Sequence, residues 1–367
     1  MKLLEIQTET VSIPLKQSFK TALRTVDRLE NICVRITTDT EHTGFGGAAP
    51  TAVITGETVS SILGALRHIQ DSLTGMNIED AEIIFQKLNA CMIGNHSAKA
   101  AVDMAVYDLL GKLYGLPLFR FLGGTALPLE TDMTISIDSP EKMASDSMDR
   151  AGQGFGILKI KVGNDPALDI SRIIAVRKAV GPDIKLRIDA NQGWKPKEAV
   201  VIVNRLSKEN VDIELIEQPV RAGDYAGMRF VRDRVDIPVI ADESVFSPAD
   251  ALRLIEMQAA DGINIKLMKC GGIFNAFKIA AIAESAGLTC MVGSMMESSL
   301  SVTAAAHLAC SRSVIMSYDL DAPLFCSVNP VRGGIQYRAS TITLPDGPGL
   351  GISRIQSASC PGSEALG

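Results

Sequence analysis

A repeated alternation of short β-branched strands and helical segments dominates the sequence from about residue 129 onward. Apolar and β-branched residues mark the strands, and apolar residues at helical spacing mark the segments between them. Eight parallel strands with helical crossovers predict an α/β fold of the TIM-type (β/α) barrel class. The predicted strands are residues 131–137, 157–162, 185–190, 213–219, 238–243, 262–267, 289–294 and 315–321.

The first part of the chain has a different pattern, which predicts a separate α+β domain. Two long stretches are expected to form strands, and two stretches with apolar residues at helical spacing are expected to form helices. In the second helix, Ser97 is the predicted N-cap and Gly115 the predicted C-cap. The strands are residues 2–15 and 29–47, and the helices are residues 57–73 and 97–115.

The two patterns divide the chain into three parts. Residues 1–125 are expected to form the α+β domain and residues 126–325 the barrel. No helix is visible after the eighth strand, where the chain becomes polar and rich in glycine. We therefore expect residues 326–367 to return to the first domain.

The overall composition narrows the class of protein. With 367 residues, 46% of them hydrophobic, the chain is long enough for a large folded domain and a smaller one. A net charge of −6 and no basic run argue against a nucleic-acid partner. No stretch approaches the ~20 apolar residues of a membrane span, and the N-terminus does not resemble a signal peptide. The seven cysteines form no C-x-x-C motif, so we expect reduced thiols and a cytoplasmic location.

Three carboxylates at the ends of successive predicted strands indicate a metal site. They are Asp189, Glu217 and Asp242 on strands three, four and five, and active sites of (β/α) barrels lie at this end. A lone carboxylate at a strand end is more often solvated, but three together repel one another unless a cation joins them. Hard oxygen ligands on rigid strands favour Mg²⁺. Glu243 alternates in direction with Asp242, and spacing alone does not decide which of them faces inward.

Two lysines in the second strand point to acid–base chemistry. Lys159 and Lys161 are two residues apart, so both face the barrel interior, where a charge is costly. Lys266 on the sixth strand would face them across the barrel mouth, while Lys269 is expected to be solvated. We expect Lys159 to lower the pKa of Lys161 by like-charge repulsion and to contact the reacting oxygens of the substrate.

The eighth strand places two more carboxylates, Asp319 and Asp321, on one face opposite the metal site. This layout fits a substrate whose carboxylate binds Mg²⁺ and whose opposite end carries a positive charge. Its central carbon would have one lysine base on each face. Removal of a proton next to a carboxylate produces an enediolate, and a divalent cation offsets its charge. Return of the proton from the opposite lysine would invert the stereocentre.

These segments resemble the enolase superfamily, specifically its muconate-lactonizing subgroup. The resemblance implies an N-terminal capping domain, Asp242 rather than Glu243 as the third Mg²⁺ ligand, and Lys161 and Lys266 as the acid–base pair. The matching motifs, in chain order, are LKIKVG, RIDANQGW, IEQP, ADES and NIKLMKCGG.

Within this subgroup, the motif DLDAP at residues 319–323 resembles the dipeptide epimerases. The resemblance implies that Asp319 and Asp321 hold the α-ammonium group of a dipeptide, and that Thr134 and Ser294 border the substrate. Gly47 departs from the subgroup, where many relatives have an acidic residue.

Two loops, residues 18–27 and 49–57, are expected to close over the site as a lid. The resemblance implies that Arg24 receives a side-chain carboxylate, although it would equally well pair with Asp27. The rest of the lid is largely apolar. The second residue of the dipeptide is therefore expected to be Glu or a hydrophobic residue.

Other functions fit parts of this pattern. Three alternatives lie within the superfamily: a cycloisomerase, an o-succinylbenzoate synthase and an N-succinylamino-acid racemase. Their substrates need no cationic group at the end away from the metal, so the paired aspartates argue against them. A barrel aldolase that forms a Schiff base would use a lysine with a lowered pKa as nucleophile, but it would not need three carboxylates. A non-catalytic dipeptide-binding protein would not need the acid–base set. The sequence leaves open whether copies of the chain form a homo-oligomer.

Overall fold

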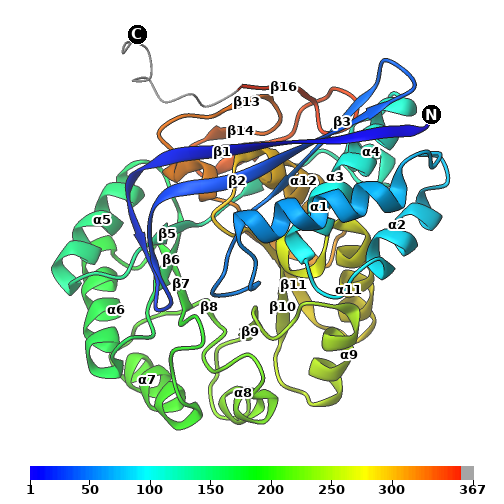
Figure 1. Ribbon diagram of the computed structural model, residues 1–367. Coiled ribbons are helices and arrows are strands. Elements are labelled where there is room, and N and C mark those ends of the chain that lie inside the picture. Colours follow the sequence, from blue (N-terminus) through cyan, green and yellow to red (C-terminus); the bar gives the residue numbers. More distant parts are fainter. Residues whose placement is uncertain (357–367) are drawn as a thin grey trace.

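The computed structural model describes residues 1–356, and it begins with a three-stranded antiparallel sheet (Figure 1). The order is β1 (Leu3–Lys20), β2 (Thr25–Thr38) and β3 (Thr43–Ala48). The sheet packs on α3 (His96–Leu113), which is buried along almost its whole length. Gly46 makes this contact possible, because a Cβ there would lie 1.9 Å from the carbonyl oxygen of Ala101. The other helices of this part are α1 (Val59–Leu73), α2 (Ala81–Ala90) and α4 (Leu118–Phe121).

The start of α3 differs from the prediction. Asn95 precedes the first helical residue, His96, and adopts a left-handed conformation with φ of 53°. Ser97 was expected to cap this helix but lies inside its first turn. The amide and hydroxyl of Ser97 donate to the Glu57 carboxylate at 3.1 and 2.7 Å, so a side chain distant in sequence satisfies this end of the helix.

The central unit is an eight-stranded parallel sheet that curves into a barrel, which confirms the predicted fold class (Figure 1). The first and last strands meet where Thr131 bridges to Tyr318 and the Asp132 amide donates to the Tyr318 carbonyl at 3.2 Å. The strands run β5 to β12 in order: β5 (Met133–Ile135), β6 (Ile157–Lys161), β7 (Lys185–Asp189), β8 (Leu215–Glu217), β9 (Val239–Ala241), β10 (Gly262–Ile265), β11 (Thr289–Gly293) and β12 (Ile315–Asp319).

Helices connect successive strands and form the outer layer of the barrel (Figure 1). Their buried residues are mostly apolar and recur at helical spacing. Among the described residues after β12, the one helical segment is a short 3₁₀ helix at Ala322–Phe325, in agreement with the absence of a visible eighth helix in the sequence. The helices are α5 (Pro140–Gly152), α6 (Pro166–Val180), α7 (Pro196–Lys208), α8 (Tyr225–Arg232), α9 (Pro248–Glu256), α10 (Leu267–Cys270), α11 (Ile273–Ser285) and α12 (Ser299–Ala309).

The chain after the barrel contacts both earlier parts. Strands β14 (Gln336–Arg338) and β15 (Thr341–Thr343) form a sheet with β4 (Leu129–Glu130), next to the start of the barrel. Further along, the Leu350 amide donates to the Asp108 carboxylate of α3 at 2.7 Å, and β13 (Val331–Gly333) pairs with β16 (Ile352–Ile355). The end of the predicted C-terminal segment, residues 357–367, lies outside the described residues.

The hairpin of β1 and β2 extends from the N-terminal sheet to the barrel mouth (Figure 1). Near its tip, the Lys20 amide donates to the Ser136 hydroxyl at 3.2 Å, and the Lys20 ammonium pairs with Asp138 at 2.6 Å. Both partners lie in the loop after β5. The predicted lid loop at residues 18–27 is therefore the end of a long hairpin, attached to the barrel rim.

Within the part of the chain that the structure describes, no helix is long and apolar enough to cross a membrane. The six cysteines in this part are free thiols.

Candidate active site

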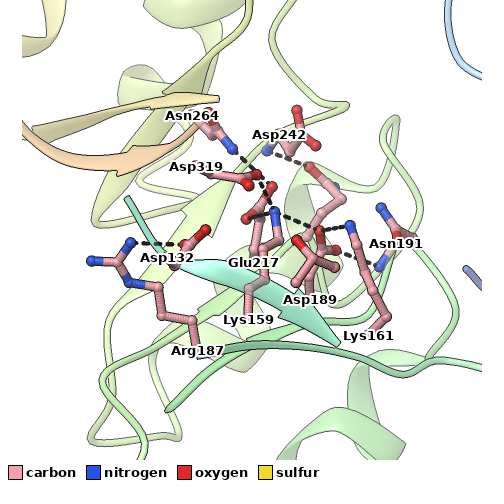
Figure 2. Close-up of polar contacts among 12 residues, drawn as sticks. Asp132, Lys159, Lys161, Arg187, Asp189, Asn191, Glu217, Asp242, Asn264 and Asp319 are labelled. Carbon is pink, nitrogen blue, oxygen red and sulfur yellow. Dashed lines mark hydrogen bonds and ion pairs between the residues drawn. The ribbon is translucent and has the colours of Figure 1, made fainter. Parts of the chain in front are cut away.

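Asp189, Glu217 and Asp242 converge at the carboxyl ends of β7, β8 and β9 (Figure 2). All three are buried, and one oxygen of each lies within 4.8 Å of the others. We call this group the metal triad. Three carboxylate oxygens held by adjacent strands are the hard donors that Mg²⁺ prefers, so the residues present fit this ion.

Two asparagines that sequence reasoning did not single out support the metal triad. Asn191 adopts a left-handed conformation with φ of 41°, and its backbone amide donates a hydrogen bond to the Asp189 carboxylate at 2.9 Å. Asn264 on β10 donates its side-chain amide to Glu217 at 2.9 Å. Glu243, the alternative to Asp242, accepts a hydrogen bond from Asn191 at 3.2 Å and lies outside the metal triad.

Both lysines of β6 face the barrel interior, as the strand period predicts (Figure 2). The Lys161 ammonium lies 2.6 Å from Asp189. The Lys159 ammonium lies 3.0 Å from Asp189, 2.7 Å from Glu217 and 2.7 Å from Asp319. The predicted like-charge repulsion between Lys159 and Lys161 is opposed by Asp189, whose carboxylate contacts both ammonium groups.

Lys266 approaches from the opposite side of the mouth, since β6 and β10 are four strands apart in an eight-stranded barrel. Its ammonium lies 2.8 Å from Asp242 and 3.9 Å from Glu217. It borders the cavity described below, as does Lys161, whereas Lys159 is buried and does not border it.

Lys269 was expected to be solvated, and this was wrong. It is buried, and its ammonium lies 2.6 Å from the other oxygen of Asp242. It also donates to the backbone carbonyls of Asn264, at 3.0 Å, and of Asp242. Two backbone carbonyls and one carboxylate oxygen therefore surround this ammonium group, and its ion pair helps to fix the position of Asp242.

The metal triad and its lysines shift one another's pKa values. Burial would raise the pKa of Asp189, but Lys159 and Lys161 hold it below its ordinary range. Burial and the nearby Asp189 charge raise the pKa of Glu217 to about 7. Burial would lower the pKa of Lys159, but Asp189, Asp319 and Glu217 raise it well above its ordinary range. The lysines therefore offset much of the negative charge that the three carboxylates bring together.

A second group of carboxylates lies at the end of β12. Asp319 and Asp321 both border the cavity. Asp321 accepts the Thr134 amide at 2.6 Å, and the Ser294 amide donates to the Asp319 backbone carbonyl at 3.0 Å. The two predicted neighbours of the substrate therefore also hold the aspartates in place.

Asp132, which sequence reasoning did not single out, completes this second group. One oxygen of each of Asp132, Asp319 and Asp321 lies within 4.8 Å of the others. We call these residues the strand-eight triad. Arg187 pairs with Asp132 at 2.9 Å from inside the barrel (Figure 2). A signal was present in the sequence, since Arg187 and Asp189 are two residues apart and must share a face.

A cavity between the lid and the barrel brings the predicted substrate residues together. Arg24 borders it from the hairpin tip and forms no ion pair within residues 1–356, so the alternative pairing with Asp27 is absent. Burial lowers the pKa of Arg24. The cavity is lined by Phe19, Thr21, Leu23, Arg24, Val53, Ile54, Thr134, Lys161, Asn191, Lys266, Ser294, Met295, Met296, Asp319, Asp321, Ala322 and Phe325.

Family models match both halves of the chain. Residues 4–123 match the N-terminal domain of mandelate racemase / muconate lactonizing enzyme, and residues 142–357 match the enolase C-terminal domain-like family. The chain belongs to the enolase superfamily. The resemblance noted in the sequence is therefore confirmed.

Relatives of this superfamily member include several dipeptide epimerases. It is 54% identical to the L-Ala-D/L-Glu epimerase of Clostridium acetobutylicum, over 95% of this chain and 97% of that protein. The solved structure of the Bacillus subtilis L-Ala-D/L-Glu epimerase with bound substrate superposes with a TM-score of 0.95, at 50% identity over 96% of this chain and 99% of that one. An Enterococcus faecalis dipeptide epimerase with Mg and L-Leu-L-Tyr gives a TM-score of 0.94, at 41% identity over 96% and 100%.

Proposed function

We propose that this protein is a Mg²⁺-dependent dipeptide epimerase, an isomerase that inverts the α-carbon of the C-terminal residue of an L,L or L,D dipeptide. The observation that carries the proposal is the pair of aspartates at the end of β12, which share one cavity with two lysines from opposite strands. Carboxylates suit the α-ammonium group at one end of a dipeptide, and the metal triad suits its carboxylate at the other. The relatives described above support this substrate class.

Lys161 and Lys266 carry out the proton transfers. One amine removes the α-proton, and the opposite ammonium donates a proton to the other face, which inverts the configuration. The two roles exchange when the other epimer is the substrate. The metal triad would hold Mg²⁺, whose positive charge would offset the second negative charge formed on the substrate carboxylate.

The remaining residues bind and orient the dipeptide. Asp319 and Asp321 hold the α-ammonium group, with Thr134 and Ser294 fixing these aspartates and bordering the substrate. Lys159 lies between the two acidic triads and keeps their carboxylates in place.

Side-chain specificity is assigned to the lid. Arg24 has no carboxylate partner within residues 1–356 and is oriented toward the same cavity as the bases, so it is suited to the carboxylate of a Glu side chain. Phe19, Val53 and Ile54 beside it are suited to a hydrophobic residue. Glu is our first choice for the second residue, and a hydrophobic residue is the alternative.

A second candidate is N-succinylamino-acid racemase activity. A relative from Bacillus cereus, 36% identical over 96% of this chain and 95% of that protein, is an N-succinyl-L-Arg/Lys racemase. Its substrates have no α-ammonium group, so the paired aspartates disfavour this activity here. A Schiff-base aldolase would form a covalent adduct that borohydride traps.

We also propose that residues 1–125 act as the capping domain, residues 126–325 as the catalytic domain and residues 326–367 as a return to the capping domain. We further propose a cytoplasmic location and assembly into a homo-oligomer. Size-exclusion chromatography with light scattering tests the oligomeric state.

The deciding experiment is a screen of L,L dipeptides in heavy water, read by mass spectrometry for deuterium at the α-carbon. We expect incorporation and epimerisation with Ala-Glu and with some hydrophobic dipeptides. N-acetylated dipeptides should be poor substrates. Equal turnover of acetylated and free dipeptides would refute the proposal in favour of the racemase.

A further inference from the structure

A third buried carboxylate lies behind the two aspartates that face the cavity. Asp132 directly precedes β5, is fully buried and does not border the cavity. One of its oxygens nevertheless lies within 4.8 Å of oxygens of Asp319 and Asp321. Three carboxylates at this separation repel one another unless cations compensate them.

The cations around the strand-eight triad compensate only part of its charge. Lys159 pairs with Asp319 at 2.7 Å, and Arg187 pairs with Asp132 at 2.9 Å. Lys159 also contacts the metal triad, and Arg187 is shared with Glu214, whose carboxylate lies 2.6 Å from its Nε. Within residues 1–356, Asp321 has no ion pair.

Two further observations describe the state of the Asp132 carboxyl group. The Oδ1 atom of Asp132 is buried and has no hydrogen-bond partner among residues 1–356. Burial and the charge of Asp319 raise the pKa of Asp132 well above its ordinary range, although Arg187 opposes this effect. A positive charge held at Asp319 and Asp321 opposes this upward shift and favours the ionised form of Asp132, so a bound ammonium group and the Asp132 carboxylate stabilise each other.

We propose that Asp132 is a positioning residue for substrate binding, whose negative charge strengthens the hold of Asp319 and Asp321 on the α-ammonium group of the dipeptide. This inference rests on the proposed function, because it assumes an ammonium group at those aspartates. Arg187, fixed by Glu214, holds the Asp132 carboxylate in place. A unit charge roughly 7 Å away, in a site of effective dielectric constant about 20–40, changes affinity roughly 10- to 50-fold.

The test uses the Mg²⁺-loaded protein and two ligands that differ only in the ammonium group. They are L-Ala-L-Glu and N-propionyl-L-Glu, and isothermal titration measures the Kd of each. Asp132→Asn removes the charge but keeps an oxygen that accepts from Arg187. We expect Ala-Glu to bind the variant roughly 10- to 50-fold more weakly, with N-propionyl-Glu changed less than about twofold and kcat at saturation changed less than about threefold.

Glu214→Gln provides a second variant at a partly exposed position. It leaves more of the Arg187 charge to neutralise Asp132, so Ala-Glu should bind about 2- to 3-fold more weakly, again without an effect on N-propionyl-Glu. Asp103→Asn is the matched control, because Asp103 is a fully buried carboxylate that does not border the cavity and accepts a hydrogen bond from the Ile273 amide at 2.6 Å. It should lower the unfolding temperature and leave both Kd values unchanged.

Equal losses for both ligands in Asp132→Asn would overturn the proposal, since they would indicate a general structural role. Unchanged binding of both ligands would overturn it as well. Failure of the proposed function gives a different result, because the wild-type protein would then bind N-propionyl-Glu as tightly as Ala-Glu.

Discussion

The barrel mouth contains two groups of three buried carboxylates, and they differ in the cations around them. The metal triad contacts four lysines, two of which also border the cavity. Within residues 1–356, the strand-eight triad pairs with one shared lysine and with one guanidinium, that of Arg187, which does not border the cavity. Similar carboxylates are therefore suited to different ligands, a divalent ion surrounded by proton-transfer groups on one side and a monovalent ammonium group on the other.

The largest expected effect tests the lysines on the metal side. Lys161→Ala and Lys266→Ala should each lower the rate of epimerisation by about 10²–10⁴-fold, because inversion needs a base on both faces. Each variant should still exchange the α-proton of one epimer. Proton NMR in heavy water, with the L,L and L,D dipeptides supplied separately, measures this. Native-like interconversion by either variant would show that a single mobile base serves both faces.

The next effect separates the two triads directly. Glu217→Gln should raise the Mg²⁺ concentration needed for half-maximal activity at least about tenfold, because it removes a charged ligand. Asp321→Asn should instead lower kcat/KM for free dipeptides by an amount equivalent to ~2–5 kcal/mol. Steady-state kinetics at varied Mg²⁺ and dipeptide concentrations measures both. If the two variants change the same parameter, the division of labour between the triads is wrong.

A smaller effect concerns the lid. Arg24→Met should reduce kcat/KM for Ala-Glu about 10- to 100-fold, since a hydrogen bond to a charged group is worth roughly 1.5–3 kcal/mol. Ala-Phe should be affected much less, and Thr21→Ser at the same hairpin tip serves as the matched control. Kinetics with both dipeptides measures the difference. Equal losses would show that Arg24 does not read the side chain.

The smallest effect is on stability and follows from Asp321. Burial and the charge of Asp319 raise its pKa from 3.8 to about 6. A carboxyl group with a raised folded-state pKa contributes stability that is present below pH 4 and lost as the pH rises through about 6. Asp321→Asn should therefore raise the unfolding temperature at pH 7 by a few degrees, about 1–3 kcal/mol, and have little effect at pH 4. Scanning calorimetry without substrate measures this, and a lower unfolding temperature at pH 7 would contradict the assigned shift.

Strand periodicity accounts for how much of the site was predictable. Lys159, Lys161, Asp189 and Glu217 lie on short strands of a regular barrel, so position along the chain fixes both their face and their height. The fold class followed from the same regularity.

The missed features depend on contacts that periodicity does not encode. Lys269 lies in a one-turn helix, where two backbone carbonyls and Asp242 converge to bury its ammonium. Asp132 directly precedes its strand, and it is held in place by an ion pair with Arg187, which is distant in the sequence. Ser97 lost its expected N-cap role because Glu57 supplies the acceptor from another segment.

The long hairpin of β1 and β2 has a consequence for biosynthesis. Its strands are translated before some of their partners, because the Ser327 amide donates to the Pro14 carbonyl of β1 and the Lys20 amide near the tip donates to the Ser136 hydroxyl. Closing a loop of that length costs chain entropy that is recovered only when the late partners emerge. Until then the nascent chain carries an unpaired strand edge, which is a template for aggregation. The hairpin whose tip borders the cavity is thus exposed to such pairing until the later segments emerge.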